Sequence, residues 1–128
     1  MKMAVAILGL AMAAAVPMTA QAASDDMVVV ALPDGSLAAD ALIKGQFNDA
    51  IGKLQLMRLN GENDPARLIN LGNAYAGAGR MERARAAYRA ASFAPEETLL
   101  LANGTQESSR SIAQRALGRL KAPVYASR

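Results

Sequence analysis

The chain contains no cysteine, no histidine and no tryptophan, and aromatic residues make up only 4% of its 128 residues. The absence of cysteine excludes a disulfide framework and thiolate chemistry. The absence of histidine removes the commonest general base and the commonest metal ligand. Scarce aromatics together with abundant alanine are typical of closely packed helices. The length is that of a single domain.

The charged residues show no pattern of a catalytic or nucleic-acid site. The net charge of +3 is small and the basic residues are mixed with acids, so nucleic-acid binding is not predicted. The acidic residues are scattered along the chain and form no paired-carboxylate or metal-binding motif. Gly72, Gly77 and Gly79 lack the strand and the Gly-Lys-Ser/Thr sequence of a phosphate loop. We therefore expect no enzyme, no cofactor and no bound metal.

Residues 1–22 have the three parts of a secretory signal peptide. Lys2 supplies the positive region, residues 4–15 are apolar, and Ala20-Gln21-Ala22 forms a small-x-small cleavage site. We expect cleavage after Ala22, which places the mature chain in the periplasm or outside the cell. No stable membrane span is expected after cleavage.

The segment 64–95 predicts a pair of helices. Asp64 is a good N-cap and Pro65 suits the first helical position. Apolar and small residues then recur at helical spacing in two runs that are separated by Gly77 and Gly79. Pro95 ends the second helix.

This segment resembles a tetratricopeptide repeat, at about residues 62–95. The residues that carry the resemblance are Leu68, Leu71, Gly72, Tyr75, Ala84, Tyr88, Ala91 and Pro95. A shift of 34 residues pairs Gly45 with Gly79 and Ala50 with Ala84, which indicates a degenerate repeat at about residues 36–60, where Ser36 is a plausible N-cap. The resemblance implies an all-α fold of helical hairpins, an α–α superhelix, over residues 36–121.

The two ends of the chain do not fit the repeat. Residues 23–35 form an extended N-terminal arm, in which three consecutive valines favour β structure. A last helix, capped by Ser108 or Ser109, closes the domain, and residues 122–128 form a flexible tail. Because Asn103-Gly104 is a strong turn signal, we also hypothesise a small two-stranded patch that pairs residues 28–30 with residues 99–101.

The resemblance implies a protein or peptide partner, because such repeats bind peptides in the groove lined by their first helices. In the well-formed repeat, this predicts Ile69, Asn70, Asn73 and Ala76 as partner-binding residues, with Asn73 directed away from the core. The alternative is that both asparagines are solvated polar positions. Arg85 and Arg89 share one face of the second helix. That face is either solvated or a site for an acidic partner.

Two function classes follow. The first is an exported interaction module or assembly adaptor without catalytic activity. The second is a structural or accessory helical protein without a recruited peptide, dimeric or associated with the cell envelope through its basic face. An open groove at Asn73 favours the first class, whereas a groove filled by the N-terminal arm favours the second. The oligomeric state stays open.

Overall fold

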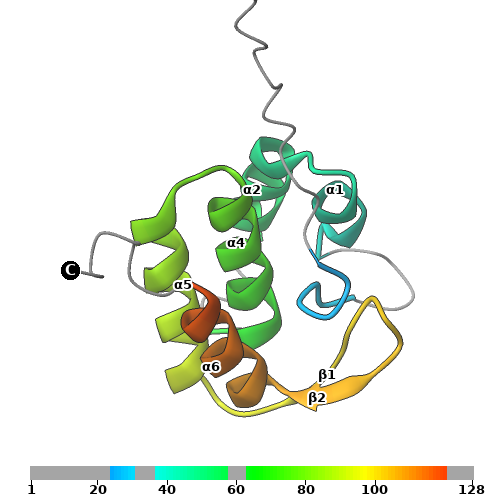
Figure 1. Cartoon of the computed structure of the whole chain (residues 1–128), viewed down its shortest axis with the longest axis vertical. Helices are drawn as coiled ribbons and strands as arrows, with labels where there is room; N and C mark the ends of the chain where they lie inside the picture. The colour runs from blue at the N-terminus through cyan, green and yellow to red at the C-terminus, as the bar shows by residue number, and fades with distance from the viewer. Residues whose placement is uncertain (1–23, 31–36, 58–62, 121–128) are drawn as a thin grey trace, which may run out of the picture.

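The computed structural model describes residues 24–30, 37–57 and 63–120, and in these ranges the chain is mostly helical with a small two-stranded antiparallel sheet (Figure 1). The elements are α1 (Ala39–Ile43), α2 (Phe47–Leu56), α4 (Pro65–Gly77), α5 (Met81–Phe93), β1 (Thr98–Leu100), β2 (Gln106–Ser108) and α6 (Ser109–Arg119). The predicted signal peptide, the predicted N-cap Ser36 and the predicted tail 122–128 lie outside the described residues. None of the helices described has the length and apolar character needed to cross a membrane.

The helices α4 and α5 form the hairpin that the sequence predicts. The Asp64 side chain accepts a hydrogen bond from the Ala66 N–H at 3.1 Å, and Pro65 occupies the first helical position. Gly79 adopts a left-handed φ of +78°, which lets the chain reverse between the helices. Figure 1 shows α4 in the middle of the molecule, between α2 and α5.

The turn between α1 and α2 repeats the turn between α4 and α5. Gly45 has a φ of +75°, and the Gln46 N–H bonds to the Ala41 carbonyl at 2.8 Å. In the second hairpin the Arg80 N–H bonds to the Tyr75 carbonyl, also at 2.8 Å. These bonds have the six-to-one pattern of a Schellman cap, and the paired residues are 34 positions apart. The two hairpins therefore reverse direction by the same local mechanism.

The first hairpin begins later than the sequence indicates. Ala38 has a left-handed φ of 55°, so the helix α1 starts at Ala39 and is only five residues long. Ala38 is the N-cap residue of α1. The side chains of Leu37 and Ala38 are nevertheless buried in the core, which explains why their spacing resembles that of a helix.

The helices α4 and α5 approach closely because Gly72 has no side chain. A Cβ atom at this position would lie 2.4 Å from Cε1 of Tyr88, so the tyrosine ring occupies the space above the glycine. Ala84 is fully buried on α5. The repeat pattern implies that Gly72 lets the two helices approach and that Tyr88 fills the space beside it, and the structure agrees.

The strands follow the C-terminus of α5 and lead into the N-terminus of α6, and β1 contacts the N-terminal arm, here defined as residues 24–30. β1 pairs with β2 in an antiparallel hairpin that turns at Asn103-Gly104, and this hairpin was not predicted. The predicted pairing of the arm with residues 99–101 is present as one antiparallel bridge between Val29 and Leu101. The flanking bonds run from Val30 N–H to the Leu100 carbonyl and from Ala102 N–H to the Val28 carbonyl, each at 2.9 Å.

We predict that Gly72→Ala destabilises the chain relative to Gly52→Ala, because nothing lies within 4 Å of a Cβ at Gly52. Both changes gain about 1 kcal/mol of helix propensity, so the difference between them isolates the clash with Tyr88. Overpacking costs about 1–3 kcal/mol. Urea unfolding of the two variants measures this difference. Equal stability of the two variants would show that α4 and α5 do not meet at Gly72.

Candidate functional site

The inner face of α4 carries a pair of buried asparagines that bind the backbone of the N-terminal arm. Asn70 is fully buried, and its Oδ1 accepts from the Val29 N–H at 2.9 Å. Its Nδ2 donates to the carbonyls of Val29 at 2.7 Å and Leu37 at 2.8 Å. The amide thus binds both backbone groups of Val29, as a neighbouring β-strand would.

Asn73 extends this arrangement one turn further along α4. Its Nδ2 donates to the Met27 carbonyl at 2.8 Å and to Oδ1 of Asn70 at 3.2 Å. Its Oδ1 accepts from the Tyr88 hydroxyl at 2.6 Å. Burial raises the pKa of Tyr88 well above the range of a free tyrosine, so this hydroxyl stays protonated and able to donate. The network connects the arm, α4 and α5.

The prediction that Asn73 points away from the core is wrong. Asn73 is only 5% exposed, Asn70 and Ile69 are fully buried, and Ala76 is half-buried. The groove along α4 is filled by the chain's own arm, because the apolar residues of the arm need burial and its backbone needs hydrogen-bond partners. In this arrangement the asparagines bind a backbone segment, as the resemblance implies, but that segment belongs to the same chain. Its residues 25–27 form a turn and not the extended structure expected from the sequence.

The C-terminal helix holds the beginning of the arm by charge. Arg115 donates to the backbone carbonyl of Asp26 at 2.8 Å and forms an ion pair with Glu107. Arg119 forms an ion pair with the Asp26 carboxylate. The hydrogen bond from Arg119 lowers the pKa of Asp26, and the hydrogen bond from Arg115 lowers the pKa of Glu107. The arm is therefore fixed by α4, by β1 and by α6.

The outer face of α5 presents a different surface. Arg85 is part-buried, pairs with Glu82 at 2.7 Å and donates to the Leu120 carbonyl at 3.4 Å. Arg89 is exposed and makes no ion pair within the described residues. The two arginines therefore have different surroundings. Arg85 connects α5 to the end of α6, and Arg89 faces solvent.

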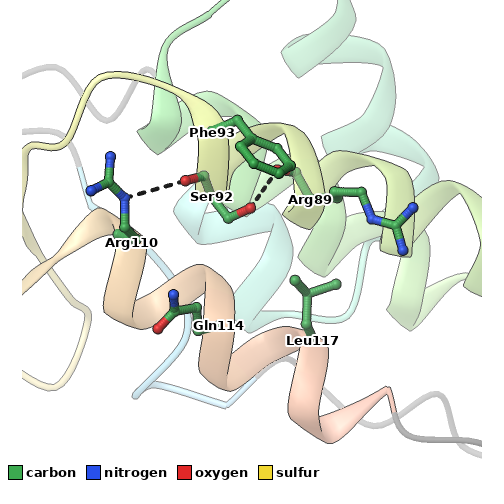
Figure 2. A pocket seen from close by; sticks show the side chains of 6 residues that line it. All are labelled: Arg89, Ser92, Phe93, Arg110, Gln114 and Leu117. Atoms are coloured by element: carbon green, nitrogen blue, oxygen red, sulfur yellow. Dashed lines mark hydrogen bonds between the residues drawn. The ribbon is translucent and has the colours of Figure 1, made fainter.

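Arg89 lines a surface groove between α5 and α6, which we call the α5–α6 groove (Figure 2). Its lining residues are Arg89, Ser92 and Phe93 from α5 and Arg110, Gln114 and Leu117 from α6. At one end, Arg110 donates from Nε to the Ser92 carbonyl at 3.3 Å and pairs with Glu96 at 3.0 Å. The Phe93 side chain is 83% exposed.

Of these six residues, only Arg89 was predicted from the sequence to bind a partner. Phe93 could have been found on a helical wheel of α5, because it falls on the side opposite the buried residues Ala84 and Ala91. No local sequence signal indicates the contribution of α6, since its position beside α5 depends on the whole fold. The six lining residues offer two guanidinium groups, one amide, one hydroxyl and two apolar side chains.

We predict that Asn70→Ala lowers the free energy of unfolding by about 2–4 kcal/mol, because four hydrogen bonds to buried groups are lost at once. Asn48→Ala is the matched control, since Asn48 is exposed on α2 and should change stability by about 0.5 kcal/mol or less. Denaturant unfolding measures both variants. Amide exchange at Val29 should accelerate in the first variant only. An unchanged Val29 exchange rate would contradict the bond to Asn70.

We also predict that Asp26→Asn lowers the melting temperature at neutral pH and that the deficit disappears in acid. A carboxylate with a lowered pKa contributes stability that is present above its unfolded pKa, about 3.9, and is lost as the pH falls through its folded pKa. Thermal melts from pH 7 to pH 2 should therefore converge. Asp49→Asn, on the exposed face of α2, is the control. A deficit of the same size at pH 2 and at pH 7 would mean that packing, not charge, is lost.

Comparison with family models, with curated proteins and with solved structures finds no match for this chain.

Proposed function

We propose that this chain is an exported, non-catalytic protein–protein interaction module or assembly adaptor, built from tetratricopeptide-like hairpins. The repeat pattern of residues 62–95 supports this, as does the equivalent capping of the two hairpin turns 34 residues apart. The signal-peptide pattern of residues 1–22 supports export to the periplasm or the medium. A chain without histidine or cysteine offers a surface more readily than a catalytic site.

The observation that carries the proposal is the exposure of Phe93 beside the α5–α6 groove. A phenylalanine that moves from water into an interface contributes about 1.5–3 kcal/mol. Aromatic residues and arginines are the side chains that most often dominate binding energy at interfaces, and here Phe93 lies one turn after Arg89. Because the arm covers the inner face of α4, we place the partner on this outer groove and not at Asn73.

A second candidate function is that of a structural or accessory helical protein that recruits no ligand. The observation in its favour is that the arm occupies the groove along α4, where a peptide would otherwise bind. In this case the exposed basic residues of α5 form a solvated face. The two candidates differ in whether the α5–α6 groove has a partner in the native compartment.

We predict that a photo-crosslinking amino acid placed at Phe93 gives a discrete adduct in intact cells, because this position contacts the partner directly. Leu56 is the matched control, since it is 80% exposed on α2 and lies outside the groove. The same substitution at Leu56 should give no adduct. Electrophoresis followed by mass spectrometry identifies the product.

An adduct at both positions with the same set of proteins would indicate nonspecific contact and would reject the assigned surface. The absence of an adduct at either position would favour the structural or accessory function. An adduct at Leu56 alone would place the partner on the first hairpin.

A further inference from the structure

We propose that the α5–α6 groove binds an amphipathic helix whose polar face is acidic, supplied by the protein partner. This inference rests on the proposed function, because it names the chemistry of the partner that the module recruits. It concerns the outer side of α5 and leaves the inner face of α4 to the arm.

The shape of the groove favours a helix. α5 and α6 pack antiparallel, since Arg85 reaches the Leu120 carbonyl at one end and Arg110 reaches the Ser92 carbonyl at the other. Two antiparallel helices leave a long concave surface into which the side chains of a third helix can pack, as in a helical bundle. Leu117 is part-buried against the core within this concave surface, which gives the groove an apolar floor.

Phe93 is the most exposed large apolar side chain of α5. Ala90 and Ala86 precede Phe93 by three and seven residues, so they lie on the same side of α5, and both are exposed. Alanines at these positions would let another backbone approach α5 closely, and the Phe93 ring would then insert between side chains of the incoming helix. An apolar stripe on the partner matches this arrangement of one large and two small residues.

The charge of the groove favours acidic residues beside that stripe. Arg89 has no ion pair within the described residues, and the pair between Arg110 and Glu96 leaves both side chains about half exposed, at 47% and 49%. Figure 2 shows the side chains of Arg89 and Arg110 extending in opposite directions, with Phe93 drawn between them. Carboxylates on both sides of an apolar stripe would meet these guanidinium groups.

An anionic lipid surface would also attract arginine and phenylalanine. A flat bilayer, however, would contact the protruding Phe93 and Arg89 and leave the floor at Leu117 unfilled. A helix fills this floor as well as pairing with the arginines. The concave shape therefore favours a protein helix over a membrane.

The test uses two sets of fluorescent helical peptides of about 16 residues, long enough to span α5. Both sets carry leucines at helical spacing in varied registers, and their polar positions are all glutamate in one set and all lysine in the other. Fluorescence anisotropy against the full mature chain should show saturable binding of a glutamate peptide and none of its lysine twin. Binding should weaken as salt rises.

Variants assign the binding to the groove. Phe93→Ala should weaken binding of the glutamate peptide about tenfold or more, whereas Leu56→Ala should not change it. Arg89→Glu should abolish glutamate-peptide binding and permit lysine-peptide binding, while Lys53→Glu on the exposed face of α2 is the charge control. Circular dichroism melts establish that each variant is folded.

Equal loss of binding in Phe93→Ala and Leu56→Ala, or equal binding of the two peptide sets, would overturn the proposal. Binding of anionic phosphatidylglycerol vesicles that depends on Phe93 and Arg89, without peptide binding, would replace the helix by a membrane. If no glutamate peptide binds although Phe93 gives its discrete crosslinked adduct in cells, the interaction function stands and the acidic-helix partner is wrong.

Discussion

The hydrogen bonds between the Asn70 side chain and the backbone of Val29 are the interaction on which the rest of this structure depends. A segment that crosses a helix cannot form backbone hydrogen bonds to it, because the backbone groups of the helix are already paired. Buried peptide groups without partners cost about 1–3 kcal/mol each. Asn70 supplies both a donor and an acceptor at one residue of the arm. The valines beside it can then be buried, and the inner face of α4 becomes part of the core.

Features governed by neighbouring residues could be predicted from the sequence. The Asp64-Pro65 start of α4, the Gly79 turn and the contact of Tyr88 with Gly72 each depend on local geometry or on one well-defined helix pair. The resemblance to a repeat supplied the pairing of α4 with α5. In each of these predictions, the residues that interact lie close together in the sequence.

Features governed by distant residues could not be predicted in the same way. Asn70 and Asn73 are polar, and a helical pattern alone assigns polar residues to the surface. Their burial follows from a segment more than 40 positions away that brings unpaired backbone groups to them. The strand β2 was missed because Gln106-Glu107-Ser108 is polar, and its pairing with β1 follows from the Asn103-Gly104 turn and not from its own composition. The α5–α6 groove likewise depends on where α6 packs.

The order of synthesis gives the arm a further consequence. The arm precedes α4 and α6 in the chain, so it is synthesised before the residues that bind it. Its hydrogen bonds to α4 span 41 and 46 residues, and its ion pair to α6 spans 93. Closing loops of this length costs chain entropy before any contact is gained, so we expect the arm to dock after α4 has formed. Until then the Val28-Val29-Val30 run, which favours β structure, has unpaired edges on both sides. A run of residues that can pair between molecules is therefore made before the residues that bind its backbone within its own molecule.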